Sequence, residues 1–549
     1  MINNIKKNLI ITLLGLLGGS LIAAEKVPAT QPNIVFFFAD DWGHDAGCYA
    51  VSNAPSPSDI VKTPNIDRVA GEGVRFNNAF YDCPQCTPSR AAIVSGCYFW
   101  RCGSGTFLRG TDWKSLDGPV SDLPDPFKAL PRFPQLLADH GYATAKAFKT
   151  LDFTPTLKKA SVDGLNNYLR YGLYVSQGKT VADREHRRQE VINQTRKSID
   201  KVLADHPKGK PFFFIFGPIN THRPYAPGSG QALWGINPDS LKGKLPSYRP
   251  DVPEVRTDYA DYLGEVQALD LMVGIFLEEL QKAGQLDNTL LVLAGDNGTP
   301  GFPHGKTQLY DLGMHAPLII RWPGHVQPGR TVDDYVTLKD LAPTFLTVAG
   351  IPPPAIMDAH SLLPLLEAKQ SGVIVASNDA AIFGRERHLD TARPGNLPYP
   401  SRAVRTQDFL YIRNFKPDRW PFGDPFNLGA TPAQDPVFKS LYAAPFRDMD
   451  ASLTKTWLIA HRDEPFGRPF YERTFGKRPA EELYDLRKDP QQTNNVAGSP
   501  EYQPVLKQLS TRLMNVLQAT HDPRLDDAFD HPPYVESSKT KAASNAAVE

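Results

Sequence analysis

The sequence predicts an α/β fold in which a large, mainly parallel, doubly wound sheet is flanked by helices, with a smaller α+β domain after it. Three apolar runs, at residues 33–38, 211–216 and 289–294, are too short for helices and lack polar alternation, which is typical of strands buried on both faces. Between the last two, apolar residues recur every three or four positions from Thr257 to Ala283, and Gly284 ends this helical pattern. Strands that alternate with helices favour a parallel sheet.

The composition describes a globular protein without a bulk affinity for polyanions. The 549 residues carry 60 Lys and Arg against 60 Asp and Glu, and 41% of them are hydrophobic. Zero net charge removes the broad attraction on which nonspecific binding to nucleic acid or anionic membranes depends. We therefore expect no nucleic-acid partner, and a polyanionic ligand would need a local pocket.

The amino-terminal residues have the layout of a secretory signal peptide. Lys6 and Lys7 precede an apolar stretch from Leu9 to Ile22, and Ala23-Ala24 then offer small residues for cleavage. The alternative, an uncleaved membrane anchor, is weakened because the stretch is shorter than the ~20 residues that a span needs and contains three glycines. We expect removal of residues 1–24, no membrane span in the mature protein, and a periplasmic or secreted location.

The pattern of the sequence changes near residues 373–383, after which long helical patterns are lost. The later part contains short strand-like runs, such as residues 409–412, and one good helix candidate from Glu501 to His521. Residues 536–549 are small and polar and are expected to form a disordered tail. These changes predict a large α/β domain over residues 31–380 and a smaller α+β domain over residues 381–535.

Polar residues follow each of the three predicted strands. Asp40-Asp41 come after the first strand, Asn220-Thr221-His222 after the second and Asp296-Asn297 after the third. In a doubly wound sheet, ligands bind beyond the carboxyl ends of the strands. The sequence therefore predicts that carboxylates, amides and an imidazole meet at this edge, although they are far apart along the chain.

The cysteines are few, odd in number and local. All five lie between Cys48 and Cys102, and an odd count in an exported protein leaves at least one thiol unpaired or chemically employed. Cys83-Pro-Gln-Cys86 has the spacing of a redox pair, but it lacks the early βαβ setting of a thioredoxin-like domain. A zinc site is equally weak, because no second Cys/His pair stands at ligand spacing.

The segment around Cys86 predicts a short helix that begins just after this residue. Thr87 is expected to cap the helix, Pro88 to occupy its first position, and Gly96 to end it. The amino end of a helix carries partial positive charge and free N–H groups, which stabilise a thiolate or an oxyanion, and Arg90 would add a full charge one turn further on. From the residues alone, this is either an activated side chain at an anion site or a buried cysteine beside a helix cap.

The run Cys86-Thr-Pro-Ser-Arg90, followed by Ser95-Gly96, resembles the signature of the type I sulfatases, in which this cysteine is converted to formylglycine. The resemblance covers roughly Asn33 to Ala497 and implies an alkaline-phosphatase-like fold with residues 31–380 as the catalytic domain. Residues 296–317 and 399–405 look most like the heparan N-sulfatase (sulfamidase) branch and related bacterial polysaccharide sulfatases. Four further motifs stand in the family's order: Asp40-Asp41, Asn220-Thr-His222-Arg-Pro224, Asp296-Asn297-Gly298 with Gly305-Lys306, and Glu482-Leu-Tyr-Asp-Leu-Arg-Lys-Asp-Pro490.

The resemblance implies a metal site. Asp40, Asp41, Asp296 and Asn297 offer hard oxygen ligands, which suit one Ca²⁺ ion, or Mg²⁺ if the cage is tight, better than a soft metal. The fifth ligand implied by the family is the formylglycine at position 86. Its hydrated aldehyde supplies the nucleophilic oxygen, and after the alcohol or amine leaves, the second geminal hydroxyl loses its proton to expel sulfate.

The family also implies roles for charged residues around this nucleophile. Arg90 stands at the anion site, His222 is the candidate acid for the leaving group or a donor to sulfate, and Lys149 and Lys306 would pair with sulfate oxygens. An isolated lysine is more often a solvated surface charge, and a lone histidine more often a structural residue. A formylglycine-generating enzyme or an anaerobic sulfatase-maturating enzyme is an implied partner.

One departure from the family stands out. The family commonly has Gly-Lys-x-His after a Gly-Tyr-x-Thr segment, whereas this chain has Gly141-Tyr-Ala-Thr144 and then Phe148-Lys149-Thr150-Leu151. The lysine is kept, and Gly and His are replaced by Phe and Leu. Four residues are candidates to replace the missing histidine: His44, His304, His315 and Asp152.

If Cys86 is converted, four cysteines remain, enough for two disulfides among Cys48, Cys83, Cys97 and Cys102 in one of three pairings. This pairing is a prediction from the count alone.

The sequence thus predicts an exported, Ca²⁺-dependent sulfatase that acts on an N-sulfated or O-sulfated carbohydrate. Arg387, His388, Arg402 and Arg405 are candidates to hold the sugar or a uronate, with solvated surface charge as the alternative. Two other functions stay open. One is a phosphoester or phosphonate hydrolase of the same superfamily, and the other is an inactive calcium-dependent glycan-binding protein, which the loss of the histidine would favour.

Overall fold

A computed structural model describes residues 31–51, 56–108, 111–113, 123–150, 157–159, 170–426, 428 and 445–536. Residues from Pro32 onward form one compact unit. The predicted signal peptide and almost all of the predicted tail lie outside the described residues. Among the described residues, no helix is both long and apolar enough to cross a bilayer.

The main sheet has eight strands in the order β5-β4-β6-β1-β7-β8-β2-β9. The four central strands β4, β6, β1 and β7 are parallel to one another, and β8 runs antiparallel to both of its neighbours. This confirms the predicted mainly parallel sheet. Its strands are β1 (Asn33–Ala39), β2 (Val74–Phe76), β4 (Ala143–Phe148), β5 (Lys158–Lys159), β6 (Phe212–Gly217), β7 (Thr289–Gly295), β8 (Leu318–Arg321) and β9 (Arg330–Val332).

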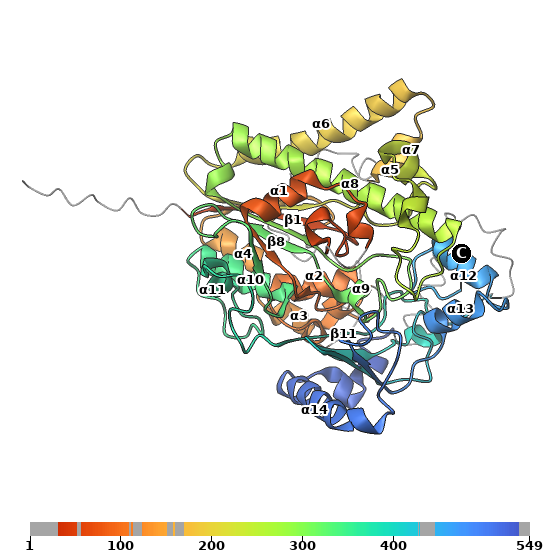
Figure 1. Ribbon diagram of the computed structural model, residues 1–549. Coiled ribbons are helices and arrows are strands. Elements are labelled where there is room, and N and C mark those ends of the chain that lie inside the picture. Colours follow the sequence, from red (N-terminus) through yellow and green to blue (C-terminus); the bar gives the residue numbers. More distant parts are fainter. Residues whose placement is uncertain are drawn as a thin grey trace, which may run out of the picture. The chain divides into compact units, whose positions relative to one another are not determined.

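Helices cover both faces of this sheet, as a doubly wound fold requires. Every residue of β1, β6 and β7 is buried, and alternate side chains enter two separate hydrophobic clusters. Figure 1 shows α1, α6 and α8 on one side of β1 and α2, α4 and α10 on the other. These helices are α1 (Pro64–Glu72), α6 (Val181–Asp205), α8 (Pro253–Lys282), α2 (Cys86–Ser95), α4 (Phe133–Asp139) and α10 (Leu341–Val348).

The helix predicted at residues 257–283 is confirmed as α8, which begins earlier, at Pro253. Proline suits the first turn because its missing N–H has no acceptor there. The left-handed backbone of Gly284, at φ 65°, follows the helix end.

The parallel register brings the predicted strand tips together. Ala39 lies opposite Gly295 in the β1–β7 pair, and Phe37 lies opposite Phe216 in the β1–β6 pair. Beyond the strands, the Asp40 amide donates to Pro218 O at 2.9 Å and the Asp296 amide donates to Ala39 O at 3.0 Å. The three polar tips therefore meet at one edge of the sheet, as predicted.

A second sheet is antiparallel and smaller, with the order β11-β12-β13-β14. The predicted strand at residues 409–412 lies within β13, and the predicted carboxyl-terminal helix is α14, whose leucines share a hydrophobic cluster with this sheet. The domain boundary at residue 380 stays a prediction, because both sheets belong to one compact unit. The elements are β11 (Ala380–Arg385), β12 (Ser401–Thr406), β13 (Phe409–Asn414), β14 (Glu481–Asp485) and α14 (Gln503–Ala519).

The remaining elements are short. Strands β3 and β10 form a parallel pair. The bounds are β3 (Ala79–Phe80), β10 (Val336–Thr337), α3 (Pro126–Ala129), α5 (Tyr171–Ser176), α7 (Ser229–Trp234), α9 (Asp311–Met314), α11 (Leu363–Glu367), α12 (Leu453–Ala460) and α13 (Arg468–Phe475).

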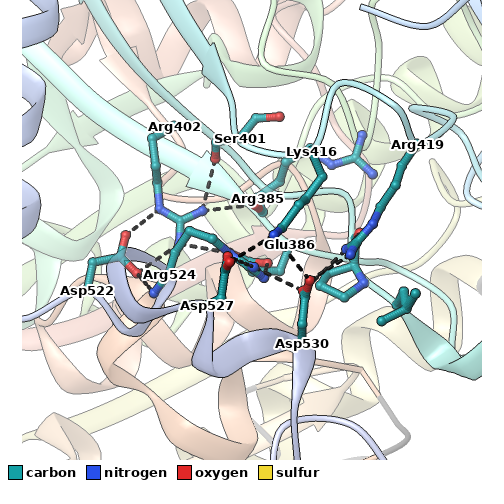
Figure 2. A network of polar contacts seen from close by, with 12 residues as sticks. Arg385, Glu386, Ser401, Arg402, Lys416, Arg419, Asp522, Arg524, Asp527 and Asp530 are labelled. Carbon is teal, nitrogen blue, oxygen red and sulfur yellow. Dashed lines mark hydrogen bonds and ion pairs between the residues drawn. The ribbon is translucent and has the colours of Figure 1, made fainter. Parts of the chain in front are cut away.

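A network of buried ion pairs fastens residues 522–530 to the second sheet (Figure 2). Arg402 of β12 contacts Asp522 at 2.7 Å and Glu386 at 2.9 Å, and Arg524 contacts Glu386 at 2.6 Å. The four side chains are buried, and opposite charges alternate among them. Because unpaired buried charges are costly, this alternation holds the carboxyl-terminal segment in place.

Candidate active site

Cys86 is the first residue of α2, so the structure moves the predicted cap by two residues. Gln85 is the N-cap residue with an extended backbone, and its carbonyl accepts from the Ser89 amide at 3.0 Å. Thr87 and Pro88 instead lie in the first turn, where amide groups have no intrahelical acceptor. Gly96 ends the helix at φ 68°, as predicted. Cys86 therefore lies at the positive end of α2, and it is 5% exposed.

Three buried carboxylates crowd the strand tips. The Asp41 amide donates to Asp296 Oδ1 at 2.8 Å, and ligand atoms of Asp40, Asp41 and His222 lie within 4.8 Å of one another. Burial raises the pKa of Asp41 and of Asp296 to about 7. Burial would also raise the pKa of Asp40, but the positive charge of Lys149, with His222 and Arg90, holds it well below its usual range.

Each carboxylate faces a cation. Lys149 Nζ lies 2.7 Å from both carboxylate oxygens of Asp40, and Lys306 Nζ lies 2.9 Å from a carboxylate oxygen of Asp41. Arg90 Nε donates to Asp296 Oδ2 at 2.8 Å. Cys86 also lies close enough to interact electrostatically with Arg90, Lys149 and Lys306. The predicted cations therefore surround one point beside Cys86.

The oxygen atoms at this point fit a hard divalent cation. Asn297 Nδ2 donates to Asp41 Oδ1 at 2.7 Å and to Gly298 O at 3.1 Å. Asn297 Oδ1, in contrast, is buried and has no hydrogen-bond partner in the described part of the chain. A buried orphan carbonyl beside three carboxylates is the donor set that Ca²⁺ or Mg²⁺ prefers. Asp40, Asp41, Asp296 and Asn297 are therefore the residues that would hold the ion.

His222 presents a neutral imidazole to the site. Its Nδ1 lies 2.6 Å from Arg223 O, and because a carbonyl only accepts, the proton is on Nδ1. Burial, reinforced by Lys306, lowers the pKa of His222 to about 4. Its Nε2, 3.9 Å from Asp41, is then a proton acceptor, whereas the predicted acid role needs a proton on this atom.

The backbone that positions Lys149 explains the sequence departure in part. Phe148 adopts φ 68°, the left-handed region that glycine enters without strain, and it occupies the position where the family commonly has glycine. Next to it, a Cβ on Gly217 would lie 1.6 Å from Lys149 O. Gly217 thus lets the Lys149 backbone pass, and Phe148 keeps the turn at the expense of backbone strain.

Of the four candidates for the missing histidine, Asp152 lies outside the described residues. The other three stack on aromatic rings: His44 on His315 at 3.8 Å between ring centroids, and His304 on Tyr310 at 3.9 Å. The histidine that shares the electrostatic surroundings of Lys306 and His222 is His388. Burial, reinforced by Lys306, lowers the pKa of His388 to about 4.

The sequence analysis missed Asp450. This carboxylate lies 3.5 Å from Lys306 Nζ and is 8% exposed. Burial opposes its ionisation, but Lys306, with His222 and His388, holds the pKa of Asp450 below its usual range. Asp450 belongs to an irregular segment just before α12, and no strand or helix pattern marks it. Only the cap of α12 by Ser452 could have been found nearby.

The structure separates the four candidate sugar-binding residues. Arg402 is enclosed in the network of Figure 2, and Arg405 pairs with Asp311 at 2.9 Å. These ion pairs give Arg402 and Arg405 structural roles and speak against contact with a sugar. Arg387 is buried, with its guanidinium 4.7 Å from the ring centroid of Phe107. His388, by contrast, lies in the field of the active-site groups.

The predicted disulfides are wrong in this structure. All five cysteines lie within the described residues, and each is a free thiol. Cys97 Sγ contacts Ser95 O at 3.6 Å, and Cys102 Sγ contacts Tyr98 O at 3.6 Å, so each thiol has its own backbone acceptor. Burial raises the pKa of Cys97 to about 11, which keeps this thiol protonated.

The fold and the site define the class of the protein. A cation held by buried acids, beside a residue at a helix amino end and among fixed positive charges, stabilises the anion that forms when an oxyanion ester is attacked. This arrangement defines a metal-assisted hydrolase with an alkaline-phosphatase-like α/β fold.

The comparisons name the family. The sulfatase family model matches residues 32–351, and the chain belongs to the sulfatase family. Human N-sulphoglucosamine sulphohydrolase is 27% identical over 536 residues, covering 90% of this chain and 91% of the relative. An ulvan-active sulfatase of Formosa agariphila is 25% identical over 522 residues, covering 91% and 77%. These matches confirm the resemblance found in the sequence, including the N-sulfatase branch.

The solved structure of BT4656 in complex with its substrate D-glucosamine-2-N,6-O-disulfate superposes with a TM-score of 0.56 and 21% identity. The match covers 90% of this chain and 99% of that chain. It supports the same fold over nearly the whole length.

Proposed function

We propose that this sulfatase removes sulfate from a sulfated carbohydrate, using a formylglycine made from Cys86 and one bound Ca²⁺. The observation that carries the proposal is the place of Cys86, at the amino end of α2 and among Arg90, Lys149 and Lys306. The overall reaction consumes one water and yields sulfate and an alcohol, or an amine if the bond is N-sulfate.

The modified residue and the metal supply chemistry that the twenty standard side chains lack. The hydrated aldehyde offers one hydroxyl as nucleophile and a second whose deprotonation expels the sulfate. Ca²⁺ supplies positive charge for the sulfate oxygens, and Mg²⁺ is the less favoured alternative because Mg²⁺ demands a tighter octahedral cage. Both assignments rest on the family and on the donor set of Asp40, Asp41, Asp296 and Asn297.

The two lysines have different exposure, and this suggests different roles. The Lys149 side chain is 28% exposed, while that of Lys306 is 1% exposed. Lys149 can therefore reach a sulfate group that enters the site, and it also orients Asp40. Lys306 acts from beneath, where it fixes Asp41. His222, with a side chain 20% exposed, is the second group open to a substrate, and it can move a proton at Nε2.

The relatives support carbohydrate as the substrate class. One acts on N-sulphoglucosamine, one on ulvan, and the solved structure holds a disulfated glucosamine. We further propose export through the predicted leader, to the periplasm or the outside, and maturation by a formylglycine-generating or anaerobic sulfatase-maturating enzyme before or during export.

A sulfate-release assay tests the proposal. The protein is matured with a formylglycine-generating enzyme and supplied with Ca²⁺, N-sulfated and 6-O-sulfated glucosamine, ulvan oligosaccharides, an aryl sulfate and an aryl phosphate. We expect sulfate release from at least one sulfated sugar, and none above background from Cys86→Ala. Faster turnover of the aryl phosphate would favour the phosphoester hydrolase. Calcium-dependent glycan binding with no sulfate release would favour the glycan-binding protein.

A further inference from the structure

Asp450 contributes to the site from outside every motif of the family. Its Oδ2 is buried and has no hydrogen-bond partner among the described residues. The nearest cation, Lys306 Nζ, lies 3.5 Å away, at the limit of hydrogen-bonding distance, while Lys306 is already 2.9 Å from Asp41. Asp450 therefore keeps acceptor capacity that the protein itself does not use.

The segment that carries Asp450 is fixed from both sides. The buried Lys455 Nζ donates to Phe446 O at 3.0 Å and to Met449 O at 2.8 Å, and Ser452 Oγ donates to Gly301 O at 2.7 Å. On the other side, Asp448 pairs with Arg393 at 3.0 Å. Because these contacts hold the backbone before and after Asp450, its carboxylate is preorganised for a ligand.

The same segment also positions His388. The backbone amides of His388 and Leu389 donate to Asp448 Oδ1 at 3.3 Å and 2.9 Å. The His388 imidazole, which is neutral at pH 7, interacts electrostatically with Lys306, Asp450 and His222. An ionised carboxylate can only accept hydrogen bonds, whereas a neutral imidazole donates one and accepts one. The group that this subsite receives must therefore bring a hydrogen-bond donor.

We propose that Asp450 and His388 form a subsite for the leaving group, which selects a sugar whose hydroxyl or amino group donates a hydrogen bond next to the sulfate being removed. This inference rests on the proposed function. Neutral hydroxyls and amines fit the subsite, and an amine can also bring positive charge. A second sulfate or a uronate at this place would be repelled by the Asp450 carboxylate. An aryl sulfate has no donor there and gains nothing from it.

The test compares two substrates in Asp450→Asn, which keeps the shape and removes the charge. For the sulfated sugar that the wild type cleaves, we expect kcat/KM to fall about 10- to 100-fold, the loss of a hydrogen bond to a charged group. For 4-methylumbelliferyl sulfate we expect a change below about threefold. Asp379→Asn, at an exposed ion pair with Arg512, is the matched control and should change neither substrate.

A second measurement does not depend on turnover. In a Cys86→Ala background, calorimetry with the desulfated sugar should show weaker binding when Asp450 is also changed to Asn. Equal losses on the sugar and the aryl sulfate would overturn the inference, because Asp450 would then act only through Lys306. Unchanged activity and binding would overturn it as well. If the wild type releases no sulfate from any substrate, the proposed function fails, whereas loss of sugar selectivity alone leaves it intact.

Discussion

The amino group of Lys306 is enclosed between Asp41 and Asp450, and replacing it tests how the site balances its charges. Lys306→Met keeps the length of the side chain and removes its charge. Since the side chain is 1% exposed, no water can take the place of the lost cation. The two carboxylates would then face each other without compensation.

The distances give the size of the effect. At 2.9 Å and an effective dielectric constant of about 20, the attraction between Lys306 and Asp41 is about 6 kcal/mol before desolvation is counted. Removing one partner of a buried ion pair costs about 3–5 kcal/mol of stability. We expect a loss of this size in EDTA and a smaller loss in Ca²⁺, because the metal would take over the charge of Asp41. Turnover of an aryl sulfate should fall about 10²- to 10³-fold, as when a preorganised charge is removed.

Urea unfolding with EDTA or Ca²⁺, together with kcat/KM for an aryl sulfate, measures both effects. Lys306→Arg keeps the charge but brings a larger, planar group into an enclosed space, so it should lie between the wild type and Lys306→Met. An unchanged unfolding midpoint in EDTA, together with kcat/KM within threefold of the wild type, would refute the reasoning.

Three further changes test other parts of the structure. Phe148→Gly should be more stable in urea than Phe148→Ala by about 1 kcal/mol, because φ 68° strains every residue except glycine; the reverse order would show that no strain is present. Glu386→Gln removes the charge between Arg402 and Arg524 and should lose about 3–5 kcal/mol, whereas a loss below about 1 kcal/mol would mean that charge does not hold the network. Burial raises the pKa of Glu265 from 4.5 to about 8, so the folded protein keeps a proton that the unfolded chain releases, and stability falls as the pH rises through this range. Glu265→Gln should reduce this fall between pH 5 and pH 8.5 in urea unfolding, and an equal fall in both proteins would contradict it.

The sequence was sufficient for the strands and for the convergence of their tips. Strands buried on both faces must be apolar throughout, so β1, β6 and β7 are visible as continuous runs. Once they are parallel neighbours, their register brings Asp40 and Asp296 together, whatever lies between them in the chain.

Other parts of the site could not be predicted because they depend on packing. Asp450 reaches Lys306 from an irregular segment, and its place follows from contacts such as that of Lys455 with two carbonyls. Arg402 could not be distinguished from a substrate-binding arginine, because only the folded chain brings Asp522 and Glu386 to it. The start of α2 depends on the extended backbone of Gln85, and glutamine gives no strong capping signal.

The central claim is that Cys86 works as formylglycine, and it is tested by comparing conversion with rate. Preparations matured to different extents would be digested, and mass spectrometry would give the fraction of Cys86 converted from thiol to aldehyde. Sulfate release from the same preparations, at saturating Ca²⁺, should be proportional to that fraction and should extrapolate to zero for unconverted protein. Full activity in protein that keeps the Cys86 thiol would contradict the account.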